Sequence, residues 1–308
     1  MKMRKSSGIP AFACRGRLLR DLMGAELRDI PGPLGYDPIG GGGPAQKEDT
    51  DMSRSVDLNA DMGESFGAWT MGDDAALLRV VSSANIACGF HAGDPDVMAR
   101  TMAQAAANGV GLGAHPGFAD LQGFGRHRMQ VPQDSLANAV RYQLGAAQAM
   151  ARAAGAPLRH LKLHGALANM ASEDETLARA CYQAALSVDP DIILLVLATT
   201  AQERAARSLG ARWAGEIFAD RAYNDDGTLV DRRLPGAVIH DPALAGPRIR
   251  QMVEEGAIVT ESGKRLPAAI DSICLHGDTA EAVALAGAVR DNLQAAGIAI
   301  LPFEGRRG

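Results

Sequence analysis

Residues 160–198 read HLKLHGALANMASEDETLARACYQAALSVDPDIILLVLA, and this stretch decides the fold. It begins with a short apolar run, HLKLHG (160–165), and ends with another, IILLVLA (192–198). The segment between them has a helical pattern, in which Ser172 and Glu175 have the spacing of a capping box. A strand, a helix and a second strand in this order form the repeating unit of a parallel sheet.

The same unit recurs along the chain from residue 55 onward. Together with the two runs above, the further apolar runs make seven: SVDLNA (55–60), SANIAC (83–88), GVGLGAH (109–115), RWAGEIF (212–218) and DSICLHG (271–277). This repetition without a break in composition predicts one closed parallel β/α barrel, with an open doubly wound sheet as the alternative. Residues 256–268, GAIVTESGKRLPA, predict a β-hairpin that turns at Ser262-Gly263 outside the barrel.

The first 51 residues lack this alternation. The first twenty contain six basic residues and no acidic one, and residues 31–50 are rich in glycine and proline. We therefore predict a disordered extension over 1–51 and a barrel domain over 52–308. The apolar stretch before Cys14 is too short and too interrupted for an export signal. No apolar run reaches the roughly eighteen residues of a membrane-spanning helix.

Composition narrows the class of protein. The net charge is −5 and no basic stripe with interleaved aromatic residues occurs, which argues against nucleic acid as a partner. The four cysteines form no CxxC pair, as expected for a chain in a reducing cytoplasm without a disulfide framework. The chain has no phosphate-binding P-loop. GVGLGA (109–114) precedes His115-Pro116 instead of a helix, so it lacks the context of a dinucleotide site.

Titratable residues follow the ends of the predicted strands. Active sites of β/α barrels lie at the carboxyl ends of the strands. Unpaired charge at a buried barrel mouth is costly, so we predict that these residues form a functional site. The set consists of Asn59, Asp61, Glu64, Cys88, His91, Asp94, His115, Lys162, His164, Asp220, Arg221, His276 and Asp278.

Some of these residues also have a simpler structural interpretation. Asp94 and Asp278 stand where helix N-caps belong, and Cys88 is small and apolar enough for the core. Asp61, His91 and His115 together would suit a divalent metal, as sets of carboxylates and imidazoles do. No local ligand spacing supports that metal site.

Seven segments after the extension form a recognisable series: DLNADMGES (57–65), NIACGFHAGDP (85–95), GAHPGFADLQGFGR (113–126), LKLHGALAN (161–169), EIFADRAYNDDGTLV (216–230), RRLPGAVI (232–239) and DSICLHGD (271–278). On these segments the chain resembles the LamB/YcsF family over residues 57–303, essentially everything after the extension. The resemblance implies a seven-stranded β/α barrel of the glycoside hydrolase/deacetylase type, and it adds Asp57, Asn85, Arg126 and Arg232 to the site. Leu163 and Ala168 replace a proline and a tyrosine of the family pattern, so we expect a locally different pocket shape.

The resemblance also implies an activity. Family members open 5-oxo-L-proline to L-glutamate at the expense of ATP, jointly with the subunits PxpB and PxpC. ATP would then bind in the complex, since this chain has no P-loop. Asp61, His91, Lys162 and His164 are the predicted catalytic residues. The predicted substrate-binding residues are Asp57, Asn59, Glu64, Asn85, His115, Arg126, Asp220, Arg221, Arg232, His276 and Asp278.

A lactam is an unreactive amide, so we expect the partner subunits to activate it by phosphorylating its oxygen. Asp61 or His91 would then act as the general base for attacking water. Lys162 and Arg221 would stabilise negative charge on the substrate carboxylate or the phosphoryl oxygens.

Two other functions stay open at this stage. A metal-dependent deacetylase of an N-acetylated carbohydrate would need a divalent metal but neither ATP nor partners. A non-catalytic substrate-binding subunit would tolerate loss of the site residues. Self-association into a homo-oligomer is also left open.

Overall fold

Seven parallel strands close into a barrel in a computed structural model that describes residues 54–276 and 280–307. The strands are β1 (Ser55–Met62), β2 (Ser83–Ala87), β3 (Gly111–His115), β4 (Leu158–Lys162), β5 (Ile193–Leu197), β6 (Arg212–Phe218) and β9 (Ser272–Leu275). Each of the first six pairs with the next, and β9 pairs with both β6 and β1, which closes the sheet. The predicted seven-stranded β/α barrel is confirmed, and the open sheet is excluded.

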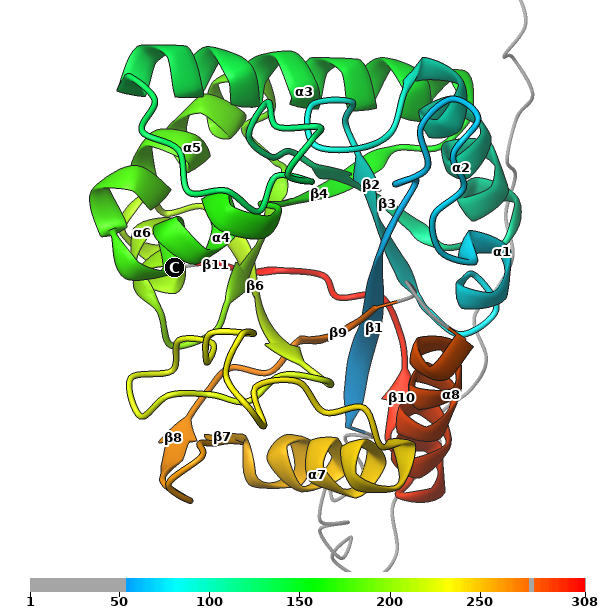
Figure 1. Cartoon of the computed structure of the whole chain (residues 1–308), viewed down its shortest axis with the longest axis vertical. Helices are drawn as coiled ribbons and strands as arrows, with labels where there is room; N and C mark the ends of the chain where they lie inside the picture. Colours follow the sequence, from blue (N-terminus) through cyan, green and yellow to red (C-terminus); the bar gives the residue numbers. More distant parts are fainter. Residues whose placement is uncertain (1–53, 277–279, 308) are drawn as a thin grey trace, which may run out of the picture. The chain divides into compact units, whose positions relative to one another are not determined.

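Helices surround the barrel on its outside (Figure 1). They are α1 (Asp74–Leu77), α2 (Pro95–Ala107), α3 (Gln133–Ala153), α4 (Gly165–Glu173), α5 (Glu175–Val188), α6 (Ala201–Ser208), α7 (Pro242–Glu255) and α8 (Ala280–Ala295). No helix within the described residues is long and apolar enough to cross a membrane. The extension predicted over 1–51 lies outside the described residues.

Side chains alternate along each strand between the helices and the barrel interior. In β1, Leu58 and Ala60 are fully buried in the hydrophobic core, whereas Asn59 donates to the Ser272 hydroxyl of the neighbouring strand β9 at 2.7 Å. Asn85 donates to the Asn59 carbonyl at 2.6 Å, and its own carbonyl contacts His160 Nε2 at 2.8 Å. The lower interior is therefore a polar network in which these side chains bond one another, while His160 Nδ1 is buried without a hydrogen-bond partner.

This network depends on a glycine. Gly113 in β3 faces His160 of β4, and a Cβ at that position would lie 2.1 Å from His160 Nε2. Only glycine leaves room for the imidazole, so the sequence GLGAH keeps a small residue where a strand would ordinarily carry a large one.

The C-terminal segment completes the barrel at its lower end. Strand β9 starts late, opposite Asp57 of β1 and Glu216 of β6, so the first residues of β1 and β6 lack it as a neighbour. Strand β10 (Ala299–Ile300) pairs there with β1, and β11 (Arg306–Arg307) pairs with β6. Phe303 between them packs against Ile193, Leu195 and Ala214.

The predicted hairpin is confirmed. Strands β7 (Ala257–Val259) and β8 (Arg265–Pro267) pair antiparallel in a sheet of their own, next to α7 (Figure 1). Gly263 has φ +83° in the connecting turn, which favours glycine. Three of the cysteines, Cys88, Cys181 and Cys274, are free and buried, as predicted, while Cys14 lies outside the described residues.

One predicted helix start is wrong. Ser172 does not cap a helix: it lies in the last turn of α4, and its hydroxyl donates to the Asn169 carbonyl. The cap of α5 is Asp174, which accepts from the backbone N–H of Thr176 and Leu177. An aspartate adjacent to the first helical residue supplied the nearer acceptor. The prediction for Asp94 is correct, since its side chain caps α2 through Asp96 and Val97.

Candidate active site

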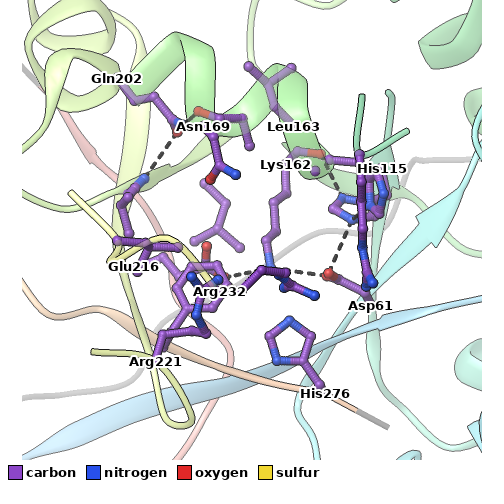
Figure 2. A pocket seen from close by; sticks show the side chains of 18 of the residues that line it. Asp61, His115, Lys162, Leu163, Asn169, Gln202, Glu216, Arg221, Arg232 and His276 are labelled. Carbon is purple, nitrogen blue, oxygen red and sulfur yellow. Dashed lines mark hydrogen bonds and ion pairs between the residues drawn. The ribbon is translucent and has the colours of Figure 1, made fainter. Parts of the chain in front are cut away.

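A cavity of about 70 Å³ opens among the carboxyl ends of the barrel strands. One water needs roughly 10–15 Å³ by the same measure, so the cavity suits a small molecule. Figure 2 shows its polar side chains pointing inward from several strands. The lining residues that bear on function are Asp61, Glu64, His115, Arg126, Lys162, Leu163, His164, Ala168, Asn169, Gln202, Glu216, Phe218, Arg221, Arg232 and His276.

Lys162 lies at the floor of the cavity between two carboxylates (Figure 2). Its Nζ is 3.0 Å from Asp61 Oδ1 and 2.8 Å from Glu216 Oε1. It also contacts the Cys274 thiol at 3.0 Å. Burial disfavours the ammonium, but Asp61 and the neighbouring negative groups outweigh burial and hold the pKa of Lys162 well above its usual value. Lys162 is therefore a permanent cation that fixes the position of Asp61.

Asp61 is held from three sides. Besides Lys162, Asn85 Nδ2 donates to its Oδ1 at 3.0 Å, and His115 Nε2 lies 3.2 Å from its Oδ2. Burial raises the pKa of Asp61, but the charges of His115 and Lys162 outweigh burial and hold the pKa well below its usual range. Asp61 is thus an ionised carboxylate on the cavity wall.

Three histidines lie side by side at the rim. The rings of His91 and His164 stack with centroids 3.6 Å apart, and His164 Nδ1 lies 2.9 Å from His115 Nε2. Burial, with the neighbouring rings, lowers the pKa of His164 to about 3 and that of His91 well below its usual value. Both imidazoles are therefore neutral. His91 lies behind the other two and does not line the cavity.

His276 also lines the cavity and is held by Asp220, which does not line it. Its Nδ1 lies 2.8 Å from Asp220 Oδ2. Burial opposes protonation, but the Asp220 carboxylate outweighs burial and raises the pKa of His276. The pair suits a proton donor whose acidic form persists toward neutral pH.

Three arginines add positive charge around the opening. Arg126 lies over the Phe124 ring at 4.9 Å, and Arg232 reaches the cavity from the exposed part of the long loop between β6 and α7. Arg221 is buried and donates to the carbonyls of Ala237 and Val230, so part of its guanidinium holds that loop in place.

Not all residues predicted for the site reach the cavity. Asp57, Asn59 and Asn85 lie deeper in the barrel and support Asp61 and Lys162 from below. Asp94 caps α2, Cys88 is a buried thiol whose pKa burial raises to about 12, and Asp278 lies outside the described residues. Leu163 and Ala168, the two departures from the family pattern, both line the cavity and so shape it.

Sequence reasoning missed Glu216 and Cys274, the two other partners of Lys162. A glutamate inside the apolar run RWAGEIF was the available signal, because a carboxylate in a buried strand needs a cationic partner. Which lysine supplies that partner depends on the order of strands around the barrel.

Comparisons with known proteins agree with this geometry. The LamB/YcsF family model matches residues 56–308. A 5-oxoprolinase subunit from Ruegeria pomeroyi is 71% identical over 249 residues, which are 81% of this chain and 98% of that protein. The corresponding 5-oxoprolinase subunit from Rhodopseudomonas palustris is 50% identical over 81% of this chain and 99% of its own length. The crystal structure of a lactam utilization protein from Thermus thermophilus has a TM-score of 0.77 at 43% identity, covering 81% of this chain and 100% of that one.

Proposed function

The chain belongs to the LamB/YcsF family, and we propose that it opens the lactam ring of 5-oxoproline as one component of an ATP-dependent 5-oxoprolinase. The 71% identity to a protein named as a 5-oxoprolinase subunit supports the activity. The observation that carries the proposal in this chain is the charge of its small cavity. Four cationic side chains and three carboxylates line it, an excess of one positive charge: Arg126, Lys162, Arg221 and Arg232 against Asp61, Glu64 and Glu216. Protonated His276 is offset by its partner Asp220.

An excess of one positive charge suits a substrate with a single carboxylate. 5-Oxoproline carries one carboxylate, and its lactam is neutral. We assign the substrate carboxylate to Arg126 and Arg232, which line the cavity and whose planar guanidinium groups match a carboxylate in two-point contact.

Partner subunits supply the ATP chemistry in this proposal. A cavity of about 70 Å³ accommodates a small lactam but not a nucleoside triphosphate beside it. We place ATP on the counterparts of PxpB and PxpC, where its γ-phosphoryl group would pass to the lactam oxygen. The phosphorylated amide carbon is then electrophilic enough for water to attack.

Ring opening then needs a base and an acid. Water adds to the activated carbon and loses a proton to Asp61; the carbon–nitrogen bond breaks, and the ring nitrogen takes a proton from His276. A second water releases phosphate from the resulting acyl phosphate and leaves glutamate. Of the two predicted bases, Asp61 fits this role better, because it lines the cavity and His91 does not. Lys162 acts as a positioning residue for Asp61.

Reconstitution tests the proposal. The chain, its two partner subunits, ATP and 5-oxoproline together should release glutamate and ADP in equal amounts, and omission of any component should stop both. Asp61→Asn should lower the rate by about 10²–10⁴-fold, the range for one positioned acid–base group. Asp191→Asn, an exposed carboxylate before β5 at the opposite end of the barrel, serves as the control.

Each rival function has its own outcome. Unchanged glutamate release in Asp61→Asn would mean that the chain is a non-catalytic component of the complex. Hydrolysis of an N-acetylated sugar by the chain alone, with added metal and without ATP, would favour a deacetylase.

A further inference from the structure

Four potential metal ligands meet beside the cavity, and all of them but His91 line it. One ligand atom from each of Glu64, His91, His115 and His164 lies within 4.8 Å of all the others. Proximity alone is no evidence of a metal, since neighbouring polar groups often bond one another. The hydrogen bonds of the imidazoles show which ring nitrogens carry a proton and which have a lone pair available for a metal ion.

The tautomer of His115 is fixed from behind. Its Nδ1 lies 2.9 Å from the backbone carbonyl of Lys162. A carbonyl oxygen only accepts, so Nδ1 carries the proton. In the neutral ring, Nε2 then has a bare lone pair, and this atom points toward His164 and Asp61.

The tautomer of His164 is fixed in the same way. Its Nε2 lies 2.9 Å from the Phe124 carbonyl, so Nε2 carries the proton and Nδ1 is bare. Phe124 has φ +55°, a left-handed conformation that non-glycine residues rarely adopt. The loop thus accepts a strained residue at the position whose carbonyl orients His164, which is the mark of a functional constraint.

With the His115 ring neutral, two bare nitrogens face each other. His115 Nε2 and His164 Nδ1 are 2.9 Å apart, and Asp61 Oδ2 lies 3.2 Å from the same His115 atom. Lone pairs at this separation repel unless a cation lies between or beside them. Metal-binding histidines have this arrangement: the outer nitrogen donates to a carbonyl, and the inner one is left for the ion.

His91 provides an independent observation. It is 1% exposed, and neither of its ring nitrogens has a hydrogen-bond partner. Its Nε2 points into the group, 3.7 Å from Glu64 Oε1, and His164 Nδ1 lies at the same 3.7 Å from that oxygen. Two ligands of a tetrahedral zinc ion, each about 2.0–2.1 Å from it, lie roughly 3.4 Å apart. Separations of 2.9–3.7 Å bracket this value.

We propose that Glu64, His91, His115 and His164 bind one divalent transition-metal ion of the zinc type. Three imidazoles and one carboxylate match the preference of zinc and its neighbours, whereas magnesium and calcium favour oxygen ligands. This set differs from the sequence prediction by replacing Asp61, which Lys162 holds, with Glu64 and His164. The site stands whether or not the chain opens a lactam, because it rests on the ligands alone.

Metal content of the purified full chain is the first test. After metal removal, incubation with Zn²⁺ and gel filtration, elemental analysis should find about one zinc per chain. His164→Ala and His91→Ala should each lower this to near zero. His240→Ala, which removes an exposed histidine outside the group, should keep the full content. Any affinity tag that contains histidine must be cleaved first.

Two further measurements keep the result interpretable if a variant folds poorly. Co²⁺ in place of Zn²⁺ should give the visible d–d bands of a nitrogen- and oxygen-coordinated ion, and these bands should disappear in the conservative Glu64→Gln variant or change shape. Zn²⁺ should raise the melting temperature of the wild type and not that of His164→Ala, as expected for a ligand that binds the folded state.

Two results would overturn the proposal. One is absence of stoichiometric zinc or cobalt in the wild-type chain, which would mean that a proton on His115 satisfies the facing lone pairs. The other is full metal content in all three histidine and glutamate variants, which would locate the ion elsewhere. Neither measurement involves ATP, partners or 5-oxoproline, so failure of the proposed activity leaves them unaffected.

Discussion

At the scale of single residues, the barrel interior separates structural carboxylates from reactive ones. Asp57 and Asp61 are only four residues apart on the same face of β1. Asp57 accepts from the hydroxyls of Ser82 at 2.6 Å and Ser83 at 2.7 Å, as well as from Ser272, with no cation in direct contact. Asp61 faces Lys162 and stays ionised. Burial raises the pKa of Asp57 to about 6, although the serine hydroxyls and Arg159 act in the opposite direction.

This shift predicts a pH-dependent stability. The folded chain binds the Asp57 proton more tightly than the unfolded chain, whose ordinary value is 3.8. The contribution of Asp57 is therefore fully present below pH 3.8 and is lost as the pH rises to about 6. Asp57→Asn, which mimics the neutral acid, should remove this fall. Relative to wild type, the variant should gain on the order of 3 kcal/mol in unfolding free energy between about pH 4 and pH 7.

Denaturant unfolding of both proteins across this pH range measures the difference. A constant difference between variant and wild type at every pH would show that Asp57 has an ordinary pKa in the folded chain.

A second residue-scale prediction concerns His276. The Asp220 carboxylate raises the pKa of His276, so His276 keeps its acidic proton to higher pH than an isolated imidazole. Asp220→Asn should lower that pKa and move the alkaline limb of the rate profile of the reconstituted complex toward lower pH. A uniform drop in rate with an unmoved limb would rule out His276 as the acid.

Residue positions were predictable to the extent that strand ends were. Asp61, His115, Lys162 and His164 all follow apolar runs, and the structure places all four on the cavity wall. The facing lone pairs of His115 and His164 were not predictable, because they depend on backbone carbonyls from Lys162 and Phe124. Asp57 was predicted to bind substrate, but it lies four residues before Asp61 in β1, deeper in the barrel than the cavity.

At the scale of elements, the C-terminal segment pairs with the first residues of β1 and β6, which β9 does not reach. This pairing could not be predicted from the sequence. Strands β10 and β11 have two residues each, and no periodicity of that length is readable. Their position follows from the late start of β9. At the lower end of the barrel, the edges of β1 and β6 that face β9 are therefore open, and β10 and β11 pair there. Apolar runs and turns predicted the long strands and the β7–β8 hairpin, whereas these short strands exist only because the closed barrel offers them an edge.

Phe303 tests the importance of this segment. It is 7% exposed, packs on Ile193, Leu195 and Ala214, and lies against the His160 ring at 5.2 Å. Phe303→Ala should lower the free energy of unfolding by about 3 kcal/mol, as for other large-to-small changes in a core. Leu301 in the same segment is 54% exposed, so Leu301→Ala should change the free energy of unfolding by less than about 0.5 kcal/mol.

Chemical denaturation of the two variants and the wild type gives both numbers. A loss of unfolding free energy in Phe303→Ala as small as that in Leu301→Ala would mean that the segment is loosely attached and that the barrel does not need it.

At the scale of the whole molecule, barrel closure was predictable because it needs no detailed contacts. Seven apolar runs separated by helical segments left few topologies, and closure brought residues from 61 to 276 to one mouth.

Surfaces that bind partner proteins are harder to predict from sequence, because exposed apolar residues are common on any surface. Here the loop between β1 and α1 presents Phe66, Trp69 and Met71, exposed by 36%, 74% and 42%.

This loop is the expected contact with the partner proteins. The same loop carries Glu64 to the cavity, and the rings of Phe66 and Trp69 stack with centroids 6.3 Å apart, which presents an ordered apolar surface beside the mouth. In the proposed reaction a partner delivers a phosphoryl group to the cavity, and such a partner must approach the mouth. Exposed tryptophan is the residue type most enriched among energetic hot spots of interfaces.

Trp69→Ser should therefore weaken assembly with the partner subunits without unfolding the barrel. Loss of a hot-spot tryptophan costs about 2 kcal/mol or more, so the dissociation constant should rise about 30-fold. Leu301→Ser removes an exposed apolar side chain at the opposite end of the barrel and should leave it unchanged. Calorimetric titration of the partner subunits into each variant measures the constant, and melting temperatures confirm the fold. Identical constants for wild type and Trp69→Ser would mean that the partners approach the mouth from another side.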